Sequence, residues 1–246
     1  MPLIRAGFYA KTLAKDVELT ALLPDGPGPH PVLYLLHGLS DDHTGWLRRT
    51  TVERMASARK LAVVMPDGGR GFYTNHDAGP AWADHMLDDV VTFVEQTLPV
   101  AREPARRFVG GLSMGGYGAL RLALARPGMF ASAHSHSGAV MHGSRPSADS
   151  RSALKDYELL QIFGQDPTGT PHDLLHLARQ AHAAGKLPRL RLDCGRADFL
   201  LNDNNAFHDA LTQAAVPHEY HLLDGAHDWD YWQQNLPAAL DWHLNR

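Results

Sequence analysis

The chain has 246 residues, of which 44% are hydrophobic and 20% are charged, and its formal net charge is −4 at pH 7. This composition is typical of a globular protein with a substantial core, and the absence of a lysine- or arginine-rich run argues against nucleic-acid binding. Cys194 is the single cysteine, which excludes an intramolecular disulfide. The N-terminal segment has no apolar signal-like core and no apolar run could span a bilayer, so we expect a soluble, cytoplasmic protein.

Short apolar runs alternate with helical patterns along most of the chain. The first two alternating runs predict an antiparallel strand pair at a sheet edge, over 8–13 and 17–23. Two apolar runs typical of strands buried on both faces follow at 32–38 and 61–66, and further strands are predicted at 106–111, 130–138, 190–195 and 218–225. Helical patterns lie between them at 45–60, 85–98, 117–126, 204–215 and 229–244, the last interrupted by Pro237.

This alternation predicts parallel βαβ units, and therefore an α/β fold with a mostly parallel central sheet flanked by helices. No internal repeat or break in composition marks a second domain, so we expect residues 1–246 to form a single domain. The stretch from about 139 to 188 is less regular and contains two amphipathic helical runs, around 154–164 and 171–185. We interpret it as an insertion or lid over one end of the sheet.

A glycine-rich turn joins the strand at 106–111 to the helix that follows. It reads "GLSMG" and fits the pattern Gly-x-Ser-x-Gly, with Ser113 in the middle. In a nucleophile elbow the serine occupies a sharp strand-to-helix turn, where small neighbours are needed because the backbone is crowded. The alternative is a glycine-rich turn with a purely structural purpose. The strand before it and the helix after it favour Ser113 as a nucleophile.

A serine nucleophile needs a base and an acid that orients the base, and the chain supplies both in the order found in the α/β-hydrolase fold. Asp198 follows the buried strand that ends in "LDCG", and His227 follows the last strand. Both residues are expected at the carboxyl ends of parallel strands, on the same side as Ser113. We therefore predict a catalytic triad of Ser113, Asp198 and His227.

Other residues compete for two of these roles. For the acid, the alternatives are Asp193, which lies inside the strand pattern, and the loop candidates Asp203 and Asp224. For the base, the alternative is His221, which alternates within a strand and is expected to be structural or exposed. The chain-order argument favours Asp198 and His227 over all of them.

An oxyanion hole needs two backbone N–H donors. One is expected from Met114, directly after the nucleophile, and the other from the loop after the early strand, where Leu39 follows His37 and Gly38. Glycine at position 38 would let the backbone turn so that the Leu39 N–H points at the site. The alternative is that Gly38 only ends the strand.

Several aromatic residues lie in or next to loops that follow strands, and they are candidates for the wall of a substrate pocket. We include Trp46, Tyr73, Trp82 and Trp229 as substrate-binding candidates, with ordinary packing as the alternative for each. Trp232 continues the pattern of the last helix, which favours packing.

The 16 histidines raise the question of a metal site. His134 and His136 alternate on a predicted strand, and His172 and His176 are four residues apart on a predicted helix. No H-E-x-x-H motif or cysteine cluster accompanies them. We therefore expect no metal and no cofactor, and interpret these residues as surface or structural histidines.

Blocks spread from about His37 to Trp232 carry a family resemblance. Together, "LLHGLSDDHTGWLRRTTVERMA", "VVMPDGGRGFYTN", "GGLSMGGYGALRLAL", "CGRADFL" and "HDWDYW" resemble the esterase D group of α/β-hydrolases. This group includes tributyrin-type esterases, S-formylglutathione hydrolases and the antigen 85 acyltransferases. The likeness is greatest to the small cytoplasmic tributyrin-type esterases. It implies a triad of Ser113, Asp198 and His227, oxyanion amides from Leu39 and Met114, and a homo-oligomer such as a dimer or tetramer.

The resemblance implies a serine carboxylesterase that hydrolyses short-chain acyl esters, from acetyl to butyryl and including acetylated sugars, through an acyl-enzyme intermediate. The alternative is a thioesterase similar to S-formylglutathione hydrolase, or an acyltransferase, with the same triad. S-formylglutathione hydrolases usually have Ser-Gly where this chain has His37 and Gly38, which argues against a glutathione thioester. The "GRGFYTNHDAGPAW" segment contains Gly79 and Pro80, which could reshape the acyl pocket.

Overall fold

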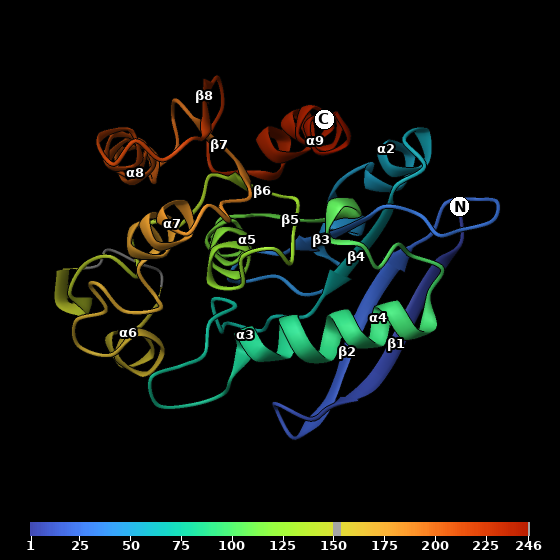
Figure 1. The fold of residues 1–246 in the computed structure, drawn as a ribbon, viewed down its shortest axis with the longest axis horizontal. Coiled ribbons are helices and arrows are strands. Elements are labelled where there is room, and N and C mark those ends of the chain that lie inside the picture. The colour runs from blue at the N-terminus through green and yellow to red at the C-terminus, as the bar shows by residue number, and fades with distance from the viewer. Residues whose placement is uncertain (150–153, 246) are drawn as a thin grey trace.

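The computed structural model describes residues 1–149 and 154–245, and these contain a sheet of eight strands in the order β1-β2-β4-β3-β5-β6-β7-β8 (Figure 1). The strands are β1 (Leu3–Ala10), β2 (Lys15–Leu22), β3 (Val32–Leu36), β4 (Ala62–Pro66), β5 (Arg107–Leu112), β6 (Ser132–His136), β7 (Arg189–Gly195) and β8 (Glu219–Leu223). β2 pairs antiparallel with β1 and with β4, whereas the strands from β4 to β8 in the sheet order run parallel. The expected antiparallel edge pair and the parallel sheet are both confirmed.

Helices cover both faces of this sheet. They are α1 (Gly45–Arg49), α2 (Val52–Ala58), α3 (Trp82–Asp84), α4 (Val91–Thr97), α5 (Met114–Ala125), α6 (Asp156–Phe163), α7 (Leu174–Ala183), α8 (Leu201–Gln213) and α9 (Trp229–Leu244). Short π or 3-10 turns occupy His85–Val90, Pro104–Arg106 and Ser147–Asp149. Figure 1 shows α2 and α9 on one side of the sheet and α4, α5 and α7 on the other.

The strand β3 shows why its sequence is a continuous apolar run. Leu33 and Leu35 pack into the core under α2 and α9, whereas Val32, Tyr34 and Leu36 pack into the core under α4, α5 and α7. A strand that is covered by helices on both faces needs apolar residues at every position rather than at alternate positions. This pattern distinguishes the central strands from β1, whose residues are alternately exposed and half-buried up to its last position.

The helix predicted over 45–60 is instead two helices, because the first helix ends before Thr50. The backbone of Thr50 is extended, with φ −136° and ψ 172°. Its hydroxyl donates a hydrogen bond to the Trp46 carbonyl oxygen (2.5 Å) and accepts one from the Val52 N–H (3.2 Å). A β-branched hydroxyl residue can therefore end one helix and begin the next by hydrogen-bonding to the backbone of both.

The prediction that Pro237 interrupts the last helix is wrong, because α9 continues through Pro237. Proline removes one N–H donor from a helix, and here the neighbouring Leu236 and Leu240 are fully buried in the core. Their packing holds the helix on the sheet despite the missing hydrogen bond. The first strand also differs from its predicted range of 8–13, because β1 begins at Leu3 and residues 11–14 form the turn to β2.

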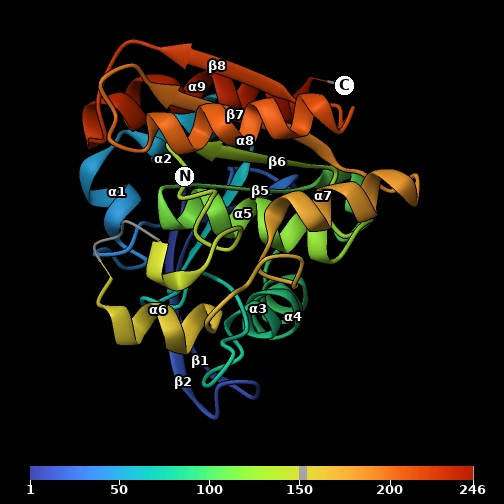
Figure 2. The same cartoon turned by 90° about the vertical axis from the view of Figure 1, so that its left-hand side faces the viewer.

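The stretch from 139 to 188 joins β6 to β7, and its residues 150–153 lie outside the described part of the chain. Its second helix, α7, packs against α5 and belongs to the helix layer on the sheet. Figure 2 shows that α6 lies farther out, with α5 between it and the sheet. Phe163 of α6 packs edge-on against Tyr117 of α5, with ring centroids 5.9 Å apart. That this stretch acts as a lid within a single domain stays a prediction.

The parallel strands place the predicted site residues at one edge of the sheet. Leu39 follows β3, Ser113 and Met114 follow β5, Asp198 follows β7 and His227 follows β8. Parallel strands have their carboxyl ends at the same edge, so the loops after them meet there. Among the described residues, no helix is both long and apolar enough to cross a membrane.

Candidate active site

Ser113 occupies the turn between β5 and α5 in a backbone conformation that non-glycine residues rarely adopt. Its φ is 52° and its ψ is −117°. Gly115 is needed beside it, because a Cβ at that position would lie only 2.6 Å from the His37 carbonyl oxygen. Strain of this kind is characteristic of a nucleophile elbow, where the turn presents the serine hydroxyl away from the crowded backbone.

Three predicted triad side chains form one hydrogen-bonded chain. The Nε2 atom of His227 lies 3.0 Å from Ser113 Oγ, and its Nδ1 atom lies 2.9 Å and 3.1 Å from the two carboxylate oxygens of Asp198. An ionised carboxylate only accepts hydrogen bonds, so Nδ1 carries the proton and Nε2 is free to accept the serine proton. This is the arrangement that general-base activation of a serine requires.

The surroundings of Asp198 keep its carboxylate charged. Burial alone would raise the pKa of this carboxyl group, but hydrogen bonds from His227 and from the Leu200 N–H hold the pKa below its ordinary value. The Leu200 N–H donates to Oδ1 at 2.7 Å, and the Asp198 side chain is closed off from solvent. A charged, fixed carboxylate can orient the imidazole and stabilise the imidazolium that forms when the serine is deprotonated.

The competing acids and the competing base have other partners. Asp193 is buried beneath the site and accepts hydrogen bonds from the Tyr231 hydroxyl (2.9 Å) and from His136 (2.8 Å). Asp203 lies in α8 and forms an ion pair with Arg145. Two further candidates lie elsewhere: Asp224 is exposed and pairs with Arg196, and His221 lies in β8 beside Glu219.

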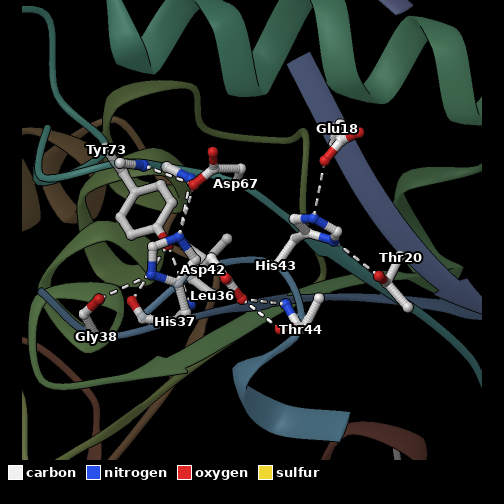
Figure 3. A network of polar contacts seen from close by, with 12 residues as sticks. Glu18, Thr20, Leu36, His37, Gly38, Asp42, His43, Thr44, Asp67 and Tyr73 are labelled. Atoms are coloured by element: carbon white, nitrogen blue, oxygen red, sulfur yellow. Dashed lines mark hydrogen bonds and ion pairs between the residues drawn. The ribbon is translucent and has the colours of Figure 1, made fainter. Parts of the chain in front are cut away.

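The loop that carries Leu39 is held by a polar network around His37 (Figure 3). The His37 N–H donates to the Tyr73 hydroxyl (3.1 Å), and that hydroxyl donates to the His37 carbonyl oxygen (3.2 Å). The ring of His37 is fixed at both nitrogens: Nδ1 donates to the Gly38 carbonyl oxygen (2.8 Å), and Nε2 accepts from the Gly68 N–H (2.9 Å). Buried bonds of this kind fix the backbone that leads to Leu39.

Gly38 is required by space rather than by an unusual backbone conformation. A Cβ at this position would lie 2.8 Å from Leu112 Cδ1, and Gly38 is not among the glycines with positive φ. That Gly38 lets the backbone turn so that the Leu39 N–H points at the site stays a prediction. The missing side chain permits close contact between Gly38 and the end of β5, and Leu39 and Ser113 line the same cavity.

A cavity of about 500 Å³ opens over Ser113 and His227. Leu39 and Met114 line it, as does Trp229. Trp232 also lines it and meets the His227 ring edge-on at 5.0 Å between centroids, although its position in α9 favoured packing alone. A volume of this size fits a small ligand.

The other aromatic candidates lie behind the cavity wall. Trp46 is buried, donates its Nε1 hydrogen to the Leu36 carbonyl oxygen (3.0 Å) and meets Trp229 edge-on. Tyr73 is fully buried beneath the His37 backbone, and Trp82 packs over Gly71. We place these three residues as supports of the site, and Trp229 as the member of the predicted set that lines the cavity.

Several residues that line the cavity were not singled out by their sequence. Phe199 is 76% exposed, and its ring lies 4.4 Å from that of His227 between centroids. Phe72 lines the cavity with a positive φ of 51°, and His142, Arg49 and Arg70 are among the other lining residues. The position of Phe199 directly after Asp198, the predicted triad acid, is a signal that could have identified it. For His142, in an irregular loop, the sequence offers no comparable signal.

Three of the histidines considered as metal ligands lie in the interior, whereas His176 in α7 is half-buried. The expectation that His172 shares a helix with His176 is wrong, because α7 begins at Leu174 and His172 lies in the turn before it. His134 and His136 share one face of β6 as their alternation predicts, with ring centroids 4.7 Å apart. His134 Nδ1 lies 2.7 Å from Nε2 of His243, and His172 Nδ1 lies 2.9 Å from the Thr74 hydroxyl. Within the ranges that the structure describes, no group of three or more His, Cys, Asp and Glu side chains could hold a metal ion.

Residues 10–243 match the family model Esterase, described as "Putative esterase". The chain belongs to this esterase family. The esterase is 28% identical over 260 residues to the acetyl esterase of Caldicellulosiruptor saccharolyticus, with 98% of each chain covered. Among solved structures, it is similar to FphF, the fluorophosphonate-binding serine hydrolase F of Staphylococcus aureus, at 33% identity and a TM-score of 0.90, with 100% of this chain and 99% of that chain covered.

The S-formylglutathione hydrolase FrmB of Staphylococcus aureus is also similar to the esterase, at 33% identity and a TM-score of 0.87, with 99% of each chain covered. The S-formylglutathione hydrolase of Agrobacterium tumefaciens, at 21% identity and a TM-score of 0.85 over 98% of this chain and 94% of that one, shows the shared fold alone. These relatives confirm the resemblance to the esterase D group and the α/β-hydrolase fold. The esterase is a serine hydrolase that acts on carboxylic ester bonds.

Proposed function

We propose that this esterase hydrolyses short-chain acyl esters, from acetyl to butyryl and including acetylated sugars, through the triad of Ser113, His227 and Asp198. The observation that carries the proposal is the unbroken hydrogen-bonded chain from Asp198 through His227 to Ser113 at the floor of a cavity. The acetyl esterase relative supports a short acyl group.

Acylation begins at the serine hydroxyl. His227 Nε2 takes the Ser113 proton as Oγ attacks the ester carbonyl carbon, and Asp198 stabilises the resulting imidazolium through its bond to Nδ1. The backbone N–H groups of Leu39 and Met114 would then stabilise the negative oxygen of the tetrahedral intermediate. The loss of one such donor typically costs about 2.7–4 kcal/mol of transition-state stabilisation.

Release of the alcohol and then of the acid completes the cycle. The imidazolium of His227 gives its proton to the leaving alkoxide as the C–O bond breaks, which leaves the acyl group on Ser113 Oγ. A water molecule then attacks the acyl-enzyme while His227 takes its proton, and the carboxylic acid departs as Oγ regains a proton. Because His227 must face the leaving oxygen, the alcohol part of the substrate belongs beside Phe199 and Trp232, which contact the His227 ring.

The test is the initial rate on p-nitrophenyl esters of increasing acyl length, measured for the wild type and for Ser113→Ala. We expect a maximum between acetyl and butyryl, and loss of turnover in the folded variant. Rates that rise steadily beyond an eight-carbon acyl group would contradict a short-chain site. Turnover near the wild-type rate in Ser113→Ala would contradict the triad.

A thioester substrate is the second candidate, favoured by the 33% identity to FrmB of Staphylococcus aureus. The same triad can cleave a thioester, and parallel rates on S-formylglutathione and on p-nitrophenyl acetate would separate the two. An acyltransferase would be recognised by transfer product when a sugar or alcohol acceptor is added. We further propose that the esterase is cytoplasmic and forms a dimer or tetramer.

A further inference from the structure

His142 is a polar side chain in the wall of the cavity close to the nucleophile. It is 4% exposed and lies in the loop after β6. That loop is tied to the nucleophile turn, because the Ala139 N–H donates to the Ser113 carbonyl oxygen at 3.1 Å. The N–H and the ring of His142 both reach back to the Ala139 carbonyl oxygen, at 3.3 Å and 3.2 Å. These hydrogen bonds, through Ala139, connect the His142 imidazole to the backbone of Ser113.

The hydrogen bond to Ala139 determines which ring nitrogen of His142 carries the proton. A carbonyl oxygen only accepts, so Nδ1 of His142 is the donor and Nε2 has a free lone pair. Burial lowers the pKa of His142 to about 4, so the ring is neutral near pH 7. Within the described part of the chain, the hydrogen bond of the ring is made by Nδ1, and His142 lines the cavity, where a ligand can reach its side chain. An acceptor in a cavity wall can accept a hydrogen bond from a ligand group that supplies a donor.

The position of His142 assigns it to the acyl side of the cavity. The alcohol side adjoins His227 and is marked by Phe199 and Trp232, which contact its ring. His142 has different neighbours: its ring lies 5.3 Å from that of Phe72 between centroids, and Phe72 packs in turn on Phe163 of α6. The acyl chain has to point away from His227, so it extends along the wall that Phe72 and His142 form.

We propose that His142 is a specificity residue that selects short acyl groups carrying a hydroxyl group, such as hydroxybutyryl. The acyl hydroxyl donates its hydrogen to Nε2 of His142, while the rest of the chain contacts Phe72. This inference rests on the proposed function, since it names the acyl group that the same site prefers. A hydrogen bond to a neutral acceptor in a desolvated site is expected to change kcat/KM by about 3- to 10-fold.

The test uses methyl esters in matched pairs, in which a hydroxyl group replaces a methyl group of equal size. The pairs are 3-hydroxybutyrate against 3-methylbutyrate, and 2-hydroxybutyrate against 2-methylbutyrate, with each enantiomer of the chiral esters assayed by pH-stat titration. The variants are His142→Phe, which keeps a ring without the acceptor, and His142→Gln, whose amide oxygen can accept in its place. The ratio of kcat/KM within each pair, compared between wild type and variants, cancels the intrinsic reactivity of the esters.

We expect the wild type to favour the hydroxyl ester by about 3- to 10-fold more than His142→Phe does in at least one pair, and His142→Gln to restore part of the difference. If the methyl-substituted esters are hydrolysed and the kcat/KM ratio of each pair is the same in the wild type and His142→Phe, the specificity role of His142 is overturned. The proposed function is then left standing. If His142→Phe does not fold, unchanged ratios in His142→Gln together with no hydroxyl preference in the wild type would overturn it. Failure of the wild type to hydrolyse any ester would overturn the proposed function as well.

Discussion

The hydroxyl group of Tyr73 offers the sharpest test of how the loop after β3, with the predicted oxyanion donor Leu39, is held. It accepts a hydrogen bond from the His37 N–H and donates one to the His37 carbonyl oxygen, two residues before the predicted oxyanion donor Leu39. Tyr73→Phe removes both bonds and keeps the ring, which packs against Gly68 and Gly118. The fold should survive this change, while the loop loses its anchor.

The magnitude follows from what the variant leaves behind. The His37 N–H would be buried without a partner, which costs about 1–3 kcal/mol of unfolding free energy. The Leu39 N–H would remain present but less well fixed, so we expect part of the roughly 2.7–4 kcal/mol that a complete loss of an oxyanion donor costs. This corresponds to a kcat about 10-fold lower, or about 1.4 kcal/mol, with a smaller change in KM.

The matched control is Tyr117→Phe. Tyr117 is also fully buried, and its hydroxyl also donates to a backbone carbonyl oxygen, that of His172, at 2.7 Å. It lies in α5 away from the loop after β3. Urea unfolding should show both variants destabilised, and p-nitrophenyl acetate kinetics should show a loss of kcat in Tyr73→Phe alone. Equal kcat in the wild type and Tyr73→Phe, or equal losses in both variants, would refute the reasoning.

Three further predictions follow from other features of the molecule. Asp198→Asn should lower kcat on p-nitrophenyl acetate by about 10⁴-fold in a protein that still unfolds cooperatively, and a loss below 10-fold would exclude Asp198 as the triad acid. Burial keeps the pKa of His243 at about 3, so the unfolded state binds more protons than the folded state below about pH 6.5. The free energy of unfolding, measured in urea, should therefore fall by ~2 kcal/mol between pH 7 and pH 5 from this group alone. An unfolding free energy that stays constant over this range would contradict the burial of His243. Gly110→Ala should lower the melting temperature, because a Cβ there would overlap the ring of His134, whereas Gly7→Ala has room; equal melting temperatures in the two variants would contradict this packing.

The sequence was sufficient to predict that Ser113, Asp198 and His227 lie together, because chain order and the parallel strands both place them at one edge of the sheet. Asp198 and His227 each follow a strand of a parallel sheet, so their loops must meet near Ser113 at the carboxyl edge. The small residues around Ser113 give a second, independent signal, because that turn is crowded. Leu39 follows a strand in the same way and lines the cavity, and its role as an oxyanion donor stays a prediction.

Features that depend on packing between distant segments could not be predicted in the same way. Tyr73 was a pocket candidate by its loop position, but its hydroxyl turns inward to a backbone that is 36 residues away in the sequence. The break at Thr50 depends on one side chain bonding to the backbone on both sides. His142 enters the cavity because its loop is tied to Ala139 and thus to Ser113, and no pattern of residues along the chain records that contact.

The most direct test of the central claim is the intact mass of the protein after reaction with a fluorophosphonate, measured for the wild type and for Ser113→Ala, followed by peptide mapping. The triad geometry predicts that the wild type gains one phosphonyl group on the peptide that contains Ser113, and that the folded variant gains none. A wild type that does not react, or a label that maps to another residue and persists in Ser113→Ala, would contradict Ser113 as the nucleophile of this esterase.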